Sequence, residues 1–83
     1  MRRVLFRPRA IKDLEALPDD ARDQVETAIE RFAQTGQGDV KMLVNENRQF
    51  RLRVGVWRIR FILEAPDRIV ILTIRHRREA YRD

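Results

Sequence analysis

The sequence predicts an α+β domain: one strand, a pair of helices, and then an antiparallel sheet that the helices cover on one face. Apolar residues recur at helical spacing between residues 9 and 35, and they alternate with polar residues in the second half of the chain. Glycine and proline separate these segments. Because the chain has 83 residues, residues 1–83 are predicted to form a single domain with a small hydrophobic core.

The first half of the chain predicts a strand followed by two helices. In residues 2–7 the side chains of Arg2, Val4 and Phe6 would face one way and those of Arg3, Leu5 and Arg7 the other, which predicts a short half-buried strand. The first helix is predicted from Arg9 to about Leu17, because its apolar residues share one helical face. Pro18 suits the first position of a second helix, which Gly36 ends. Together the two helices form a hairpin that can lie over the sheet.

The second half predicts four strands, at residues 40–44, 49–54, 56–64 and 69–75. Short turns join the last three, so they are predicted to form an antiparallel meander. The last strand is apolar on both faces, which favours a central place in the sheet. A short polar tail follows.

Positive charge is concentrated in the same half. Residues 1–47 contain eight Lys and Arg against nine Asp and Glu, a net charge of −1. Residues 48–83 contain ten Arg against four acidic residues, a net charge of +6. This segregation indicates a surface that binds nucleic acid or another polyanion.

The composition excludes several kinds of active site. Without cysteine and with one histidine, the chain can form neither a thiolate zinc site nor a Cys–His dyad, and without serine it has no Ser-His-Asp triad. Its three glycines form no phosphate-binding loop, so no metal and no cofactor are predicted. A charge at Arg7 interrupts the first apolar residues too early for a signal peptide, and the expected location is the cytoplasm.

The strongest functional signal is the pair of strands that meet at Gly55, in which arginines alternate with apolar residues. Side chains in a strand point alternately to opposite faces, so Arg51 and Arg53 share one face, and Arg58 and Arg60 share a face of the next strand. Clustered guanidinium groups repel one another unless an anion lies among them, and the simplest such partner is a phosphate backbone. Ordinary solvated strand charges are the alternative interpretation.

A basic cluster of this kind could assist RNA cleavage by the 2′-OH group. Arginines can stabilise the charge on the pentavalent phosphorus, but they are poor bases because the guanidinium stays protonated. Proton transfer would then depend on Tyr81, on His76 or on the surroundings of the RNA. For His76, a structural capping role and a catalytic role both remain open at this point. Trp57 shares its strand face with apolar residues and is expected in the core.

Several segments resemble the RelE family of bacterial toxins, within the RelE/ParE superfamily of type II toxin–antitoxin systems. The matching segments are Ala10–Leu14, Leu17–Pro18, Phe50–Ile59 and His76–Tyr81. The resemblance implies a RelE-like α+β fold and a toxin that inhibits translation by cleaving mRNA in the ribosomal A site without a metal. It also implies neutralisation by a cognate antitoxin, with operator DNA bound only through the toxin–antitoxin complex.

The resemblance also assigns roles to residues. The predicted catalytic set is Arg51, Arg53, Arg58, Arg77, Tyr81 and His76. The residues predicted to bind RNA are Arg60, Arg75, Arg78, Lys41 and Arg48. Arg51 and Arg53 correspond to two basic residues near the scissile phosphate, which are lysines in the best-studied members. Tyr81 corresponds to an aromatic residue that stacks on a base or assists proton transfer.

Two alternatives stay open at the level of sequence. The ParE branch of the superfamily shares the fold but poisons DNA gyrase and has no nuclease site. A degenerate toxin would act only as a regulator that binds its antitoxin and operator DNA.

Overall fold

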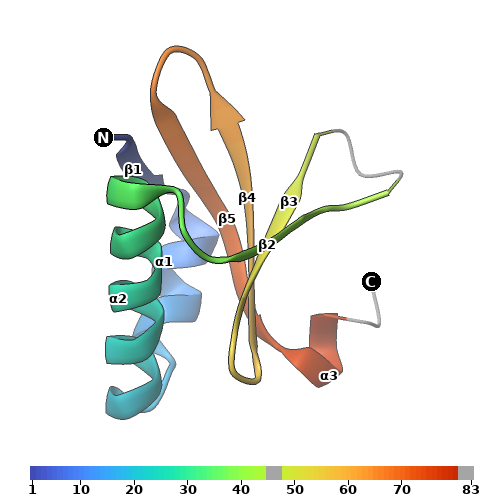
Figure 1. The fold of residues 1–83 in the computed structure, drawn as a ribbon. Helices are drawn as coiled ribbons and strands as arrows, with labels where there is room; N and C mark the ends of the chain where they lie inside the picture. The colour runs from blue at the N-terminus through green and yellow to red at the C-terminus, as the bar shows by residue number, and fades with distance from the viewer. Residues whose placement is uncertain (45–47, 81–83) are drawn as a thin grey trace.

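The structure is a computed structural model that describes residues 1–44 and 48–80. Its elements are β1 (Arg3–Phe6), α1 (Pro8–Glu15), α2 (Asp19–Thr35), β2 (Asp39–Met42), β3 (Phe50–Val54), β4 (Trp57–Glu64), β5 (Arg68–His76) and α3 (Arg77–Ala80). The strands form one sheet in the order β1-β5-β4-β3-β2. The helices α1 and α2 lie on one side of this sheet, and α3 lies on the other side (Figure 1). The α+β prediction is therefore confirmed.

The strand pairings place β5 inside the sheet, as its apolar sequence predicts. Strands β2 to β5 pair antiparallel, while β1 pairs parallel to β5 and forms one edge. Four of the five strands thus form the predicted meander and its lead-in.

Proline marks the start of both long helices, but in different ways. Pro8 is the first residue of α1, so this helix begins one residue earlier than predicted. Pro18 is the N-cap of α2 rather than its first residue, and Asp19 and Asp20 occupy the first turn, where they complement the helix dipole. At the other end, the N–H of Gly36 donates to the carbonyl oxygen of Phe32, and a φ of 76° makes glycine the favoured residue there.

The hydrophobic core lies between the two long helices and the sheet face that they cover. At its centre, the Phe61 ring lies 5.2 Å from the ring of Phe32 on α2 and 5.4 Å from the ring of Phe50 on β3. Trp57 packs against the same cluster, as expected from its strand position. The alternating apolar residues of β3 and β4 thus supply the sheet side of the core.

A bulge in β5 changes which of its residues face the core. Arg60 pairs with Thr73 and Phe61 pairs with Ile71, so Leu72 has no opposite residue on β4. An extra residue of this kind reverses the alternation of side chains beyond it. Strand β5 therefore does not keep the regular alternation of a strand: Ile71 and Ile74 both belong to the core.

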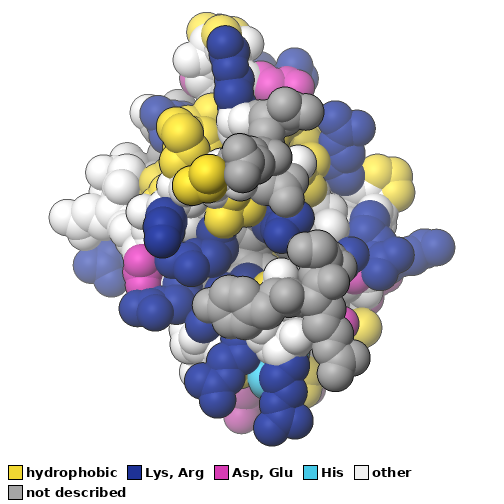
Figure 2. Space-filling view, turned by 90° about the vertical axis from the view of Figure 1, so that its right-hand side faces the viewer, with side chains coloured by type: hydrophobic (Ala, Val, Ile, Leu, Met, Phe, Trp, Pro, Cys, Tyr) yellow, Lys and Arg dark blue, Asp and Glu magenta, His cyan; other side chains and the backbone are white. Residues whose placement is uncertain are grey.

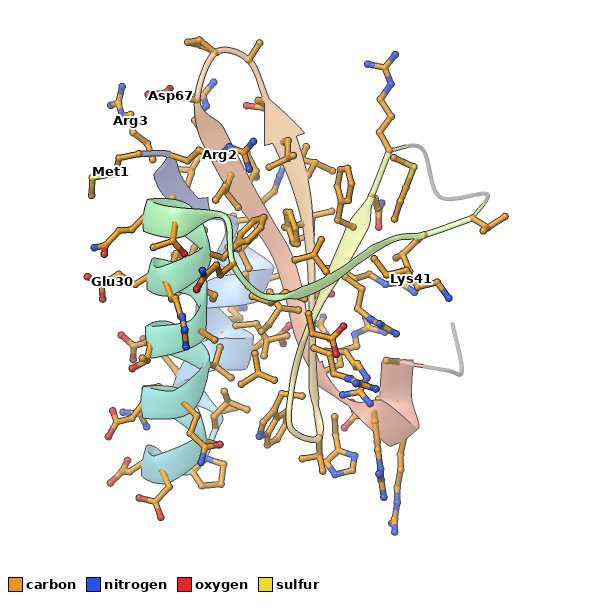
Figure 3. All side chains as sticks on the ribbon, viewed as in Figure 1. Met1, Arg2, Arg3, Glu30, Lys41 and Asp67 are labelled. Atoms are coloured by element: carbon orange, nitrogen blue, oxygen red, sulfur yellow. The ribbon has the colours of Figure 1, made fainter. Side chains whose placement is uncertain are left out.

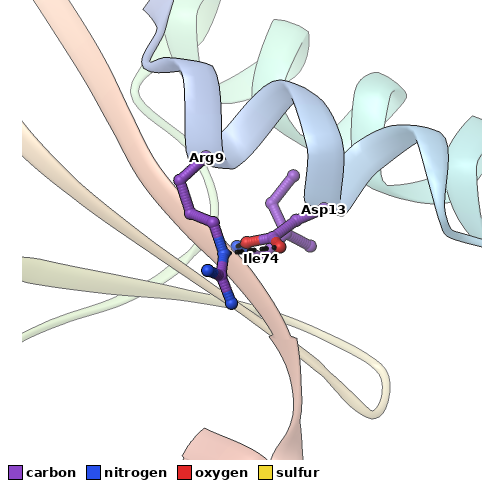
Figure 4. A network of polar contacts seen from close by, with 3 residues as sticks. All are labelled: Arg9, Asp13 and Ile74. Atoms are coloured by element: carbon purple, nitrogen blue, oxygen red, sulfur yellow. Dashed lines mark hydrogen bonds and ion pairs between the residues drawn. The ribbon is translucent and has the colours of Figure 1, made fainter.

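One carboxylate fastens α1 to the sheet where β1 ends. The last residue of β1, Phe6, pairs with Ile71, so β5 continues beyond its neighbour. There the backbone N–H of Ile74 donates to Asp13 Oδ2 at 3.0 Å, and Arg9 Nε lies 3.2 Å from Asp13 Oδ1 (Figure 4). Asp13 therefore replaces the missing strand as the hydrogen-bond partner of Ile74.

The polar tail begins as a short helix, which the sequence did not predict. The first residue of α3, Arg77, donates its backbone N–H to the carbonyl oxygen of Val56 at 2.7 Å. The turn predicted at residues 45–47 and the predicted site residue Tyr81 lie outside the described residues. No helix within residues 1–44 and 48–80 is long and apolar enough to cross a membrane.

Candidate functional site

The sheet face that α1 and α2 leave open carries two rows of mostly basic residues, each running across the strands. The first, here called the Lys41 row, joins Lys41, Arg51, Arg60 and Thr73 on β2, β3, β4 and β5. The second, the Asp39 row, joins Asp39, Arg53, Arg58 and Arg75 on the same four strands. The register therefore confirms the shared face that was predicted for the arginines of β3 and β4.

Space-filling views show the result of this register. Basic side chains gather over the middle and lower part of the open face, with apolar side chains above them (Figure 2). Lys41 extends from β2 away from the long helices, whereas Glu30 extends from the far side of α2 (Figure 3). Directly opposite residues on neighbouring strands have Cβ atoms about 5 Å apart, and like charges at that distance destabilise the sheet. The rows are thus costly to the fold.

Four arginines from the two rows line a small cavity of about 110 Å³. The lining residues are Leu43, Arg51, Arg58, Arg60, Thr73, Arg75 and Ala80. No acidic side chain belongs to this lining within the part of the chain that the structure describes. Strands β3, β4 and β5 supply the arginines, and Ala80 of α3 closes one side. The cavity therefore concentrates positive charge at a place where a small anion could lie.

Arg58 is held firmly in place among these arginines. Its side chain is only 7% exposed, and its Nη1 donates to the carbonyl oxygens of Gly55 at 2.8 Å and Trp57 at 3.1 Å. These contacts fix the guanidinium against the β3–β4 turn. A donor that is already fixed in place needs no reorganisation when charge develops beside it. Arg58 thus has both a structural contact and the rigidity that suits charge stabilisation.

Two buried nitrogens of this cavity lack hydrogen-bond partners. Across the described residues, the buried side-chain nitrogens without a partner are Arg22 Nε, Arg51 Nε and Arg58 Nε. Leaving a buried donor unsatisfied costs about 1–3 kcal/mol, and such groups are rare in native proteins. Arg51 and Arg58 both line the cavity, so these two unpartnered donors belong to residues that border it. This observation identifies the cavity as the candidate site.

Arg53 belongs to the same face but lies at its edge. Its Nε is 2.6 Å from Asp39 Oδ2, and both side chains are about half exposed, at 52% and 46%. It does not belong to the cavity lining. The structure therefore separates Arg53 from Arg51, although the sequence grouped the two.

Three predicted residues of the C-terminal segment, His76, Arg77 and Arg78, do not line the cavity. The ring of His76 meets Trp57 edge-on at 5.5 Å, on the side of the sheet that faces the core. Its Nδ1 accepts a hydrogen bond from the backbone N–H of Arg78 at 3.2 Å, so the structure gives it the capping role that the sequence left open. Arg77 and Arg78 are exposed on α3 and do not line the cavity. A catalytic role for His76 and Arg77 stays a prediction.

The remaining RNA-binding predictions divide in the same way. Arg60 and Arg75, predicted to bind RNA, line the same cavity as Arg51 and Arg58, predicted to be catalytic. The structure therefore does not separate the two predicted groups. Lys41 lies opposite Arg51 at the outer end of its row. Arg48 is exposed in the turn before β3, with a φ of 63°. Its role in binding stays a prediction.

Sequence reasoning missed Thr73 and Asp39. Thr73 contributes the one hydroxyl group of the described cavity lining, and its alternation with Arg75 along β5 was the available signal. Asp39 pairs with Arg53, but nothing in the sequence gives the register of β2 against β3. Leu43 and Ala80 were missed because neither carries a recognisable chemical group.

The arginines of this cavity can bind a phosphate and stabilise negative charge on it. Guanidinium groups bind phosphate oxygens in pairs and stabilise added negative charge. Within the described lining no carboxylate, imidazole or amine is placed to move a proton. The described residues also contain no group of His, Cys, Asp or Glu side chains that could hold a metal ion. An anion-binding site is therefore what the described geometry provides.

Comparison with known proteins gives a family and a fold. A family model described as the ParE toxin of the type II toxin–antitoxin system parDE matches residues 4–81. Among curated protein sequences, none matches the chain.

Solved toxin structures superpose over most of their length. The RelB–RelE complex from Methanococcus jannaschii gives a TM-score of 0.78 at 26% identity and covers 94% of this chain and 95% of that chain. The RelBE2 complex from Mycobacterium tuberculosis gives 0.78 at 27% identity, covering 90% and 96%. A chromosomal ParDE system from Pseudomonas aeruginosa gives 0.73 at 16% identity, covering 92% and 96%, and shows the shared fold alone.

Proposed function

The chain belongs to the ParE toxin family of type II toxin–antitoxin systems, within the RelE/ParE superfamily, and we propose that it is a ribosome-dependent mRNA endoribonuclease. The observation that carries this proposal is the cavity lined by four arginines, two of which have a buried Nε without a partner. The structural likeness to RelE chains at 26% and 27% identity supports the same choice.

The proposed reaction uses the 2′-OH group of the RNA as the nucleophile. Its oxygen forms a bond to the adjacent phosphorus, and the bond from phosphorus to the 5′-oxygen breaks, leaving a 2′,3′-cyclic phosphate and a 5′-hydroxyl. The proton of the 2′-OH passes to a base, and a proton is delivered to the departing 5′-oxygen. The arginines stabilise the charge on phosphorus between these steps.

The described cavity lining contains no carboxylate, imidazole or amine that could transfer a proton in this reaction. We assign proton transfer to Tyr81, His76 or groups of the ribosome. Positioning of the mRNA by the ribosome would offset this weakness, because holding reactants in the reactive geometry removes a large part of the barrier. Dependence on the ribosome therefore follows from the poor acid–base inventory of the cavity. It would also place the toxin in the cytoplasm.

The second candidate function is inhibition of DNA gyrase, and the family model favours it because its description names ParE toxins. A gyrase inhibitor would not need the cavity arginines for catalysis. If the chain is a nuclease, replacing a cavity arginine should strongly reduce RNA cleavage. If it inhibits gyrase, the chain cleaves no RNA and the same substitution has no catalytic step to affect.

The proposed partner is a cognate antitoxin. The M. jannaschii and M. tuberculosis relatives were solved as toxin–antitoxin complexes. By analogy, a partner protein would neutralise this chain, and operator DNA would be bound only through the resulting complex. Binding of such a partner should stabilise the folded toxin by mass action.

The test is primer extension on a translated mRNA with purified ribosomes. The wild-type chain should cut at codons in the A site only when ribosomes are present. Arg51→Ala should lower cleavage about 10²-fold, the scale for losing one preorganised donor. Arg31→Gln, which removes one positive charge from α2 on the other side of the sheet, is the matched control and should cut normally.

Arg58 needs a second readout because it also holds the β3–β4 turn. Thermal unfolding of Arg58→Ala, measured beside its cleavage rate, would separate loss of the fold from loss of catalysis. Intact mRNA with the wild-type chain, together with trapped gyrase–DNA cleavage complexes, would replace the nuclease proposal with gyrase inhibition.

A further inference from the structure

The Lys41 row continues past the cavity toward β1, at the opposite edge of the sheet from β2. The row ends on β5 at Thr73, two residues after Ile71. The backbone N–H of Arg7, which follows β1, donates to the carbonyl oxygen of Ile71 at 3.0 Å. Arg7 therefore lies beside β5 next to the end of the row. A basic residue thus lies beside the end of the row, directly after the fifth strand, β1.

Arg7 also lies on the same face as the row. It lines a hollow of about 320 Å³ together with Leu5 and Val70, which pair with each other and lie outside the core cluster. The same hollow contains Glu64 and Arg68, which form an ion pair at 3.1 Å. The hollow therefore opens on the same face of the sheet as the arginine cavity, on the side of β1.

We propose that a single strand of RNA crosses the sheet perpendicular to its strands, along the Lys41 row from β2 to Arg7. This inference rests on the proposed function, because it extends the same substrate beyond the phosphate in the cavity. Neighbouring strands lie about 4.8 Å apart, so the path from β2 to β1 is about 19 Å long. A path of that length passes more than one phosphate. The site therefore binds an oligonucleotide rather than a single nucleotide.

The two rows differ in a way that selects this path. The Asp39 row begins with a carboxylate at the β2 edge, which would repel a phosphate and already pairs with Arg53. At its other end this row stops at Arg75, four residues beyond Ile71, so Arg7, which bonds to Ile71, does not lie beside it. The Lys41 row begins with a lysine and has Arg7 beside its far end. It alone offers basic groups at both edges.

The hollow beside Arg7 gives the path an end that suits a nucleotide. Its lining includes the apolar side chains Leu5, Pro8 and Val70. The arginine cavity is about a third as large and has a mainly cationic lining. A phosphate would thus bind in the cavity, and the base of a neighbouring nucleotide would cover the apolar lining of the hollow.

The test measures how salt weakens binding of non-cleavable RNA. Fluorescence anisotropy would follow labelled 2′-O-methyl oligouridylates, a dinucleotide and a hexanucleotide, over a series of salt concentrations. Each phosphate contact with a single strand contributes about 0.7 to the slope of log affinity against log salt. Arg7→Ala and Lys41→Ala should each lower the slope for the hexanucleotide by about that amount.

The dinucleotide provides the length control. Its one phosphodiester should occupy the cavity, so Arg51→Ala should weaken its binding while Arg7→Ala and Lys41→Ala leave it unchanged. Arg31→Gln should leave both oligonucleotides unaffected. Circular dichroism of each variant would show that the fold is intact.

Two results would overturn the proposal. If Arg7→Ala keeps the wild-type slope with the hexanucleotide while Arg48→Ala lowers it, the RNA runs along β3 rather than across the sheet. If Arg7→Ala and Lys41→Ala weaken the dinucleotide as much as the hexanucleotide, the oligonucleotide does not span the row. Neither result depends on cleavage or on ribosomes, so failure of the nuclease proposal would be seen separately, as intact mRNA in the primer-extension experiment.

Discussion

The two faces of the sheet are built from alternate residues of the same strands, yet one face stabilises the fold and the other reduces its stability. On the face under α1 and α2, Leu52 pairs with Ile59 in a core that excludes water. One residue away on the open face, Arg51 pairs with Arg60, and Arg53 pairs with Arg58. The first arrangement stabilises the fold through burial of apolar surface, and the second opposes it through repulsion between like charges. Alternation allows both to occur in one hairpin.

The apolar residues of the covered face therefore stabilise the fold, whereas the arginines of the open face are available to bind an anion. A protein keeps locally unfavourable groups when function needs them and the rest of the structure can tolerate their cost. The helix-covered face must therefore supply the stability that the open face reduces. Removing a like charge from the open face should accordingly raise stability, whereas removing an apolar side chain from the covered face should lower it.

The largest effect is expected on the covered face. Phe61 is 1% exposed and touches aromatic rings from both α2 and β3. Phe61→Ala should lower the free energy of unfolding by about 3–5 kcal/mol, because it leaves a cavity at the centre of the core. Urea denaturation would measure this change. Met42→Ala, at a 59% exposed position on the edge strand β2, should change stability by less than about 0.5 kcal/mol.

A smaller effect is expected where α1 joins the edge of β5. Asp13→Ala should cost about 1–3 kcal/mol, because the backbone N–H of Ile74 would lose its partner. Arg9 contacts the same carboxylate but is 66% exposed, so Arg9→Ala should cost no more than about 1 kcal/mol. Equal losses of stability in the two variants would show that the ion pair, rather than the bond to the strand, fastens the helix.

The parts of the fold predicted correctly from sequence are those with a strong local pattern. Alternation in β3 and β4 gave their shared faces, and the apolar positions of the helices gave the covered face. The bulge at Leu72 could not be predicted, because the residues from Ile69 to Leu72 are all apolar and suit either face of the sheet. The same bulge decides that Thr73 faces the cavity and Ile71 the core.

The candidate site, like the fold, could be predicted only where the sequence pattern is local. The arginines of β3 and β4 were identified because they alternate within a single hairpin. Their division into a cavity group and an edge pair depends on contacts with Arg75 and Asp39, which lie on other strands. Register between strands that are distant in sequence is set by tertiary packing, which a single sequence does not display. Local chemistry was therefore predictable, but its grouping was not.

Replacing an arginine of the open face should reverse the sign seen on the covered face. Arg51→Gln should raise the free energy of unfolding by about 0.2–1 kcal/mol, because it removes a like charge opposite Lys41 and Arg60. The same substitution should weaken RNA binding, while Arg51→Lys should keep the charge and most of the repulsion. Thermal unfolding at low salt would measure the change in stability. A loss of stability in Arg51→Gln would contradict the view that this face opposes folding.

The smallest effect should distinguish the two rows of the open face. Asp39→Asn removes the one acidic group of the two rows and breaks the ion pair with Arg53, which is about half exposed. Exposed pairs of this kind contribute about 0.2–1 kcal/mol, so the loss of stability should lie in that range. RNA binding should become tighter, because the basic face gains one net positive charge and Arg53 becomes available to a phosphate. Competition between the wild type and the variant for one labelled oligonucleotide would measure this gain. If the variant instead binds more weakly, Asp39 serves to hold Arg53 in the position that RNA needs, and the Asp39 row belongs to the binding path after all.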